Sequence, residues 1–112
     1  MTDDLTGPGW ERAACIDDVA EGEVAGIHAG GQSIALYKVE GEVYATHDIC
    51  SHEHAHLSEG YLEGYEIECP LHQARFDIRT GKAMCRPATE GVVVYPVKLV
   101  GKDIFVKLLA VS

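Results

Sequence analysis

The chain has 112 residues, 46% of them hydrophobic and 24% charged, which fits one globular domain with a core and excludes a disordered or fibrous chain. Its net charge of −9 would repel phosphate backbones and anionic lipid, so neither nucleic acid nor a membrane surface is an expected partner. Because no apolar run approaches the roughly 18 residues of a membrane span, and the acidic N-terminus has no signal-peptide pattern, we expect a cytoplasmic protein.

The apolar pattern in the N-terminal half predicts strands and no long amphipathic helix. Residues 10–16 form a candidate strand, and the acidic connection 17–22 has room for one short helical turn. Gln32–Val39 and Glu42–His47 flank the pair Glu40 and Gly41, as the strands of a hairpin flank its turn.

A similar pair of strands closes the chain. Residues 92–100 and 104–109 are rich in β-branched and aromatic side chains and are separated by a turn at 101–103. Pro96 marks an edge or bulge in the first of them. Glycines at 60, 64 and 81 indicate tight turns between further short strands in the middle of the chain. The sequence predicts an all-β protein.

Histidine and cysteine are concentrated in one part of the chain. Residues from about 48 to 87 hold four of the six histidines and three of the four cysteines. We therefore expect a single domain over 1–112, with an antiparallel β scaffold from about 9–47 and 88–110. A subdomain that bears the site, about 48–87, is inserted into that scaffold.

Two short motifs within this subdomain have the spacing of metal ligands. Cys50-Ser51-His52 is followed, after 16 residues, by Cys69-Pro70-Leu71-His72. Thiolate and imidazole ligands favour zinc, iron or copper over calcium and magnesium. Two cysteines and two histidines on two loops fit a 2Fe-2S centre with mixed ligands, and they also fit a closed tetrahedral zinc site that only stabilises the fold. Both interpretations remain open on spacing alone.

Residues around the candidate ligands are less specific. Outside the ligand motifs, Cys15 and Cys85 are expected to be buried free thiols. His54 and His56 alternate with His52 and are expected at the surface near the site.

The chain resembles the Rieske-type ferredoxins of bacterial multicomponent aromatic-ring dioxygenases. Besides the two ligand motifs, the resemblance rests on the segments 57–64 (LSEGYLEG), 75–77 (RFD) and 80–83 (TGKA). It implies the Rieske fold and one Rieske-type 2Fe-2S cluster, in which Cys50 and Cys69 bind the inner iron while His52 and His72 bind the outer iron. High-potential relatives have Ser and Tyr hydroxyl donors where this chain has Ala74 and Phe76, so we expect a reduction potential near the low end of the Rieske range, about −150 mV.

The same resemblance implies a one-electron carrier and no enzyme activity of its own. The implied donor is an NAD(P)H-oxidising flavoprotein reductase, and the implied acceptor is a terminal ring-hydroxylating oxygenase. Oxygen activation needs a mononuclear iron site, for which the chain has no recognisable 2-His-1-carboxylate pattern. We expect a monomer. Two alternatives are the small Rieske subunit of an assimilatory nitrite reductase and a binding module stabilised by zinc.

Overall fold

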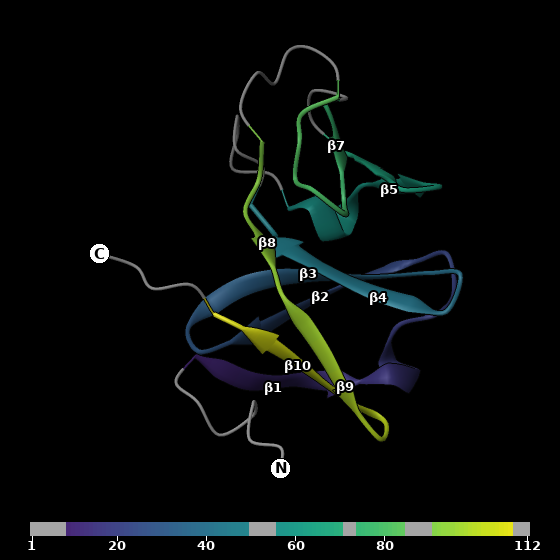
Figure 1. The fold of residues 1–112 in the computed structure, drawn as a ribbon. Coiled ribbons are helices and arrows are strands. Elements are labelled where there is room, and N and C mark those ends of the chain that lie inside the picture. The colour runs from purple at the N-terminus through teal and green to yellow at the C-terminus, as the bar shows by residue number, and fades with distance from the viewer. Residues whose placement is uncertain (1–8, 50–55, 71–73, 85–90, 109–112) are drawn as a thin grey trace.

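The computed structural model describes residues 9–49, 56–70, 74–84 and 91–108, and over these ranges it consists mainly of antiparallel strands. They form three sheets, with strand orders β1-β10-β9, β2-β3-β4-β8 and β5-β6-β7 (Figure 1). Neither of the two short 3-10 helices found in these ranges is long and apolar enough to span a membrane. The predicted all-β class is confirmed. In chain order the elements are β1 (Trp10–Cys15), η2 (Ile16–Asp18), β2 (Val24–Ala29), β3 (Gln32–Val39), β4 (Glu42–His47), η3 (Leu57–Glu59), β5 (Tyr61–Glu63), β6 (Glu66–Glu68), β7 (Arg75–Asp77), β8 (Val94–Tyr95), β9 (Val97–Val100) and β10 (Asp103–Lys107).

The predicted hairpin of β3 and β4 is confirmed, with both strands at their expected bounds. Its turn residues Glu40 and Gly41 have φ angles of 54° and 79°. Two consecutive left-handed residues match the right-handed twist of the flanking strands, and glycine adopts this conformation without a steric cost. The carboxylate of Glu21 accepts hydrogen bonds from the backbone N–H groups of both turn residues, and these bonds lower its pKa. The turn is therefore fastened to the acidic connection that precedes β2.

Strand β2 has no counterpart in the sequence-based prediction. It pairs with β3 along its whole length, from Val24 opposite Tyr37 to Ala29 opposite Gln32. Within β2 only Ala29 is buried, and exposed Gly26 and His28 interrupt the apolar pattern. Pairing with a neighbouring strand, which a local pattern does not report, makes this segment a strand.

The stretch 92–100 is one expected strand that the structure divides at Pro96. Before the proline, β8 pairs with β4; after it, β9 pairs with β10. Proline has no N–H to donate to a ladder, but its carbonyl oxygen accepts the N–H of Lys107 at 3.0 Å. The chain thereby passes from one sheet to the next at this residue, as Figure 1 shows. The prediction of a single strand was wrong, and Pro96, expected to mark an edge or bulge, is the residue at which the strand divides.

Strand β3 separates two hydrophobic cores. Its side chains alternate, so that Ile34 and Leu36 face a core shared with β1 and β10, which supply residues such as Ala14 and Ile104. On the opposite face, Ala35, Tyr37 and Val39 belong to a core shared with η3 and the β5-β6-β7 sheet. These two layers lie on opposite sides of the central sheet in Figure 1. Burial on both faces explains why β3 is a nearly continuous apolar run.

The second core includes one buried polar contact, made by Tyr37. Its side chain is fully buried, and its hydroxyl lies 2.8 Å from Oγ1 of Thr46, which in turn donates to the carbonyl oxygen of His47. Burial raises the pKa of the Tyr37 phenol. The folded state therefore holds this phenol in its neutral form.

We predict that Tyr37→Phe lowers the free energy of unfolding by about 1 kcal/mol at neutral pH, because it removes a buried hydrogen bond. The unfolded phenol ionises near pH 10, roughly its ordinary pKa, while the folded one ionises higher. The stabilisation from Tyr37 is therefore complete below about pH 10 and is lost as the pH rises from there toward the folded pKa. Urea unfolding between neutral and alkaline pH, followed by circular dichroism, measures both effects.

The matched control is Tyr61→Phe, since Tyr61 is 68% exposed. It should leave the urea midpoint unchanged at neutral pH. A Tyr37→Phe midpoint equal to that of the wild type at neutral pH would contradict the prediction.

Candidate functional site

The first candidate ligand motif follows the end of β4. Cys50 and His52 lie outside the described residues, but the residues on both sides of them are placed. Ile49 and His56 form an isolated antiparallel bridge, and the N–H of Leu57 donates to the carbonyl oxygen of Asp48 at 2.6 Å. The chain that enters the segment 50–55, the first ligand segment, therefore pairs with the chain that leaves it.

The second motif starts where β6 ends. Cys69 is fully buried, and its N–H donates to the carbonyl oxygen of Ala74 at 2.7 Å, one step beyond the paired strands β6 and β7. Pro70 is half-buried, and His72 lies outside the described residues. The segment from Cys69 to Ala74, the second ligand segment, is therefore also held at its base by a backbone hydrogen bond.

The bases of the two segments meet in one core. Leu57, which follows the first segment, and Cys69 and Ala74, which border the second, all belong to the core over the Tyr37 face of β3. Gly60 lies so close to β6 that a Cβ there would overlap the carbonyl oxygen of Glu68. Glycine at this position allows η3 and β6 to approach each other. The structure thus brings together residues that border the two motifs, which are far apart in sequence.

Asp48 is a site residue that the sequence analysis did not single out. It is 4% exposed, and its carboxylate accepts hydrogen bonds from the N–H and the hydroxyl of Ser58 at 2.7 and 2.9 Å. Nδ1 of His56 lies 3.1 Å from the same carboxylate. A charged residue directly after a strand and two positions before a candidate ligand was the available signal, but its burial becomes visible only in the fold.

The remaining histidines and cysteines are dispersed. Nε2 of His28 lies 3.1 Å from the Ser33 hydroxyl oxygen. The backbone N–H of His47 donates a hydrogen bond to the carbonyl oxygen of Val93. The side chain of His56 is 44% exposed, as expected of a surface residue.

Cys15 has a free thiol, but it is partly exposed, so the expectation of burial was wrong for it. The reason is its place at the end of β1, where the strand gives way to η2. Both His54 and Cys85 lie outside the described residues.

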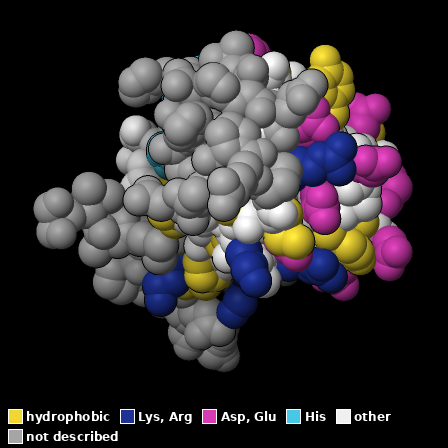
Figure 2. Space-filling model, turned by 90° about the horizontal axis from the view of Figure 1, so that it is seen from above, with side chains coloured by type: hydrophobic (Ala, Val, Ile, Leu, Met, Phe, Trp, Pro, Cys, Tyr) yellow, Lys and Arg dark blue, Asp and Glu magenta, His cyan; other side chains and the backbone are white. Residues whose placement is uncertain are grey.

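Acidic side chains surround a single cation on the β5-β6-β7 sheet. Arg75 on β7 lies 3.0 Å from Glu68, 3.5 Å from Glu63 and 3.6 Å from Glu66. The charge of Glu68 is the largest cause of the raised pKa of Arg75. Figure 2 shows acidic side chains on the right-hand side of the molecule, the side on which both β5 and the β3–β4 turn lie in Figure 1. With three carboxylates around one guanidinium, this sheet presents negative charge to solvent.

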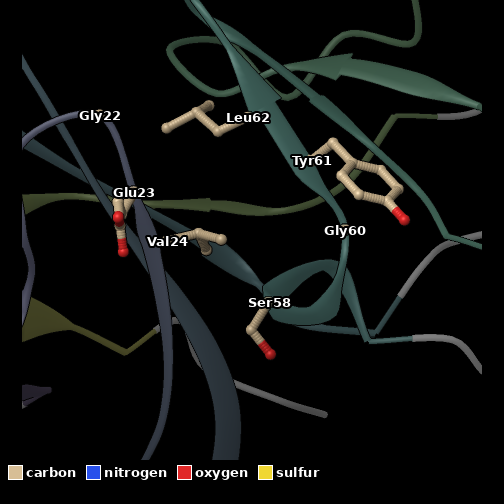
Figure 3. Close-up of a pocket in the computed structure, with 7 residues that line it drawn as sticks. All are labelled: Gly22, Glu23, Val24, Ser58, Gly60, Tyr61 and Leu62. Atoms are coloured by element: carbon tan, nitrogen blue, oxygen red, sulfur yellow. The ribbon is translucent and has the colours of Figure 1, made fainter.

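A groove of about 330 Å³ runs between the start of β2 and the η3–β5 segment, lined by residues 22–24, Ser58 and residues 60–62 (Figure 3). Ser58 belongs both to this lining and to the hydrogen bonds of Asp48. The groove therefore reaches the residues that fasten the first ligand segment.

The donor set fits a 2Fe-2S cluster of mixed ligation. Its residue types, two thiols and two imidazoles, are those that such a cluster requires. Cys69, the member of this set that lies in the described part of the chain, is fully buried in an apolar core. Exclusion of water around a cysteine ligand is among the features that tune a metal centre.

Comparison with known proteins identifies the family. The model of the Rieske [2Fe-2S] domain matches residues 9–96. The ferredoxin component of the naphthalene 1,2-dioxygenase/salicylate 5-hydroxylase systems of Ralstonia sp is 54% identical over 99 residues, which cover 88% of this chain and 95% of that protein.

Two solved structures are similar. The ferredoxin of carbazole 1,9a-dioxygenase from Nocardioides aromaticivorans IC177 superposes with a TM-score of 0.84 at 34% identity, over 88% of this chain and 96% of that one. A chain in the structure of a complex of reduced oxygenase and oxidised ferredoxin in carbazole 1,9a-dioxygenase superposes with a TM-score of 0.83 at 32% identity. The match covers 90% of this chain and 94% of that one.

These similarities decide between the alternatives left open by the sequence. A Rieske domain match favours an iron-sulfur cluster over structural zinc, and the matched relatives are ferredoxin components rather than nitrite reductase subunits. The chain corresponds to an electron carrier and not to a catalytic oxygenase. The chain belongs to the Rieske [2Fe-2S] family, within the group of ferredoxins of aromatic dioxygenase systems, and its cofactor is one Rieske-type 2Fe-2S cluster.

Proposed function

We propose that Cys50 and Cys69 bind the inner iron of the cluster and that His52 and His72 bind the outer iron. The observation that carries this assignment is the matched closure of the two ligand segments. Each is held at its base by backbone pairing, and both bases belong to one core. Two segments whose bases are anchored in one core are the support that a cluster shared between two loops needs.

The cluster supplies reversible storage of one electron. The thiolates of Cys50 and Cys69 would offset the positive charge of the iron-sulfur core, and Cys69, which is fully buried, would exclude water from its part of the site. The histidines, on the outer iron, are the proposed edge through which electrons enter and leave. Electron exchange at one edge would let two partner proteins use the same surface in turn.

The proposed partners are an NAD(P)H-oxidising flavoprotein reductase and a terminal ring-hydroxylating oxygenase. The oxygenase is supported by the similar ferredoxin, which occurs in a complex of reduced oxygenase and oxidised ferredoxin. We also propose that the chain acts in the cytoplasm as a monomer. Residues 48–87 form the cluster-binding part of the domain in this proposal, and about 9–47 and 88–110 form its scaffold.

Metal analysis and spectroscopy of the purified protein test the ligand assignment. We expect about two irons per chain, a visible spectrum that bleaches with dithionite and a rhombic EPR signal in the reduced state. Cys69→Ala should abolish all three, whereas Cys15→Ala should retain them because Cys15 lies outside both ligand motifs. One zinc per chain without colour, or an intact cluster in Cys69→Ala, would refute the assignment.

Ala74→Ser should raise the reduction potential by an amount on the order of tens of millivolts. Ala74 is buried beside Cys69, and an added hydroxyl donor there would stabilise the reduced, more negative centre. Protein-film voltammetry measures the change. Ala45→Ser is the control, since Ala45 is equally buried but lies in the opposite core. The account of a low potential fails if Ala74→Ser and Ala45→Ser give the same potential.

Electron transfer with the reductase should slow by about tenfold when salt is raised from low to high ionic strength, because salt screens steering between an acidic carrier and a basic partner surface. Stopped-flow reduction of the ferredoxin measures this rate. Glu63→Gln, on the acidic β5-β6-β7 sheet, should reduce the salt dependence, while Glu11→Gln on β1 should not. A rate independent of ionic strength would exclude electrostatic steering.

A further inference from the structure

Asp48 connects both ends of the first ligand segment to the scaffold. Its backbone N–H donates to the carbonyl oxygen of Ser33 on β3 at 3.0 Å, and its own carbonyl oxygen accepts the N–H of Leu57. Its carboxylate accepts the N–H and the hydroxyl of Ser58. One residue thus joins the strand before Cys50 to the turn that follows the segment.

The neighbouring strand leaves space for this arrangement. A Cβ on Gly26 of β2 would come within 2.6 Å of the Ser58 hydroxyl oxygen and 3.3 Å of a carboxylate oxygen of Asp48. Any side chain at position 26 would therefore press on the contact between Asp48 and Ser58. The exposed, otherwise unexplained glycine in β2 has a physical role in the placement of η3.

The Asp48 side chain is 6% exposed, and none of its described hydrogen-bond donors is a lysine or an arginine. The donors are a backbone amide, a hydroxyl and the imidazole of His56. Two of these donors, the N–H and the hydroxyl of Ser58, carry no net charge, and a carboxylate held by such groups keeps much of its field in a medium of low dielectric constant. It lies two residues before Cys50, so this field acts on whatever Cys50 holds.

We propose that Asp48 is the positioning residue of the first ligand segment and that its carboxylate helps to keep the reduction potential of the cluster low. This inference rests on the proposed assignment of Cys50 and His52 as ligands. Asp48 acts through Ser58 and the backbone of Leu57, which fix the ends of the segment. Its negative charge opposes the arrival of an electron at the cluster.

The test compares three variants as holoproteins. Asp48→Asn removes the charge at nearly constant shape, Ser58→Ala removes one hydrogen bond but keeps the charge, and Gly26→Ala crowds the contact. The control Glu42→Gln removes an exposed charge at the start of β4, the strand that ends just before Asp48. Voltammetry, EPR of the reduced state and the rate of cluster loss to an iron chelator are measured for each.

We expect Asp48→Asn to raise the potential relative to Glu42→Gln and to change the EPR line shape. It should also lose its cluster about tenfold faster, as the weakening of a hydrogen bond to a charged group would produce. Ser58→Ala and Gly26→Ala should lose the cluster faster with a smaller shift in potential. If Asp48→Asn does not fold, faster cluster loss in these two variants supports the positioning role, and wild-type rates in both overturn it.

The inference is overturned if Asp48→Asn carries a cluster with the potential, EPR spectrum and loss rate of Glu42→Gln. Failure of the proposed function looks different, because the wild type itself would then lack a Rieske cluster, or Cys69→Ala would retain one.

Discussion

Strand β3 is buried on both faces, and each face holds a different part of the molecule in place. One face packs on β1 and β10, and the other packs on η3 and the β5-β6-β7 sheet. The core over the Tyr37 face of β3 contains Cys69 and other residues that border the two ligand segments. Because protein cores are densely packed, the position of the site is coupled to the position of this one strand.

The layer between β3 and the site is not purely apolar. Tyr37 and Thr46 share a buried hydrogen bond, and Asp48 bonds Ser58 nearby. Among the residues that the structure describes, no buried side-chain nitrogen or oxygen lacks a partner. A polar network with every group satisfied fixes a specific arrangement of the layers, which an apolar contact by itself specifies less well.

Only part of this architecture was predictable from local sequence. The β3–β4 hairpin was correctly bounded, because Glu40 and Gly41 form a recognisable turn between two strongly apolar runs. Strand β2 was not, since Ala29 is its one buried residue and it is stabilised by pairing with β3. The expected strand 92–100 is divided at Pro96 into β8 and β9, which belong to different sheets. This division depends on their partners in the fold, because β8 pairs with β4 and β9 pairs with β10.

The sequence by itself determined the chemistry of the site. Two motifs that combine thiol and imidazole ligands at fixed spacing predict a metal centre, because metal preference follows from the types of donor atoms, and they fit both a 2Fe-2S cluster of mixed ligation and zinc. The resemblance to the Rieske-type ferredoxins favoured the cluster. Tertiary structure decided which residues support it. The burial of Asp48, its contact with Ser58 and the space left at Gly26 depend on three elements meeting, and contacts of that kind are not encoded by any one segment.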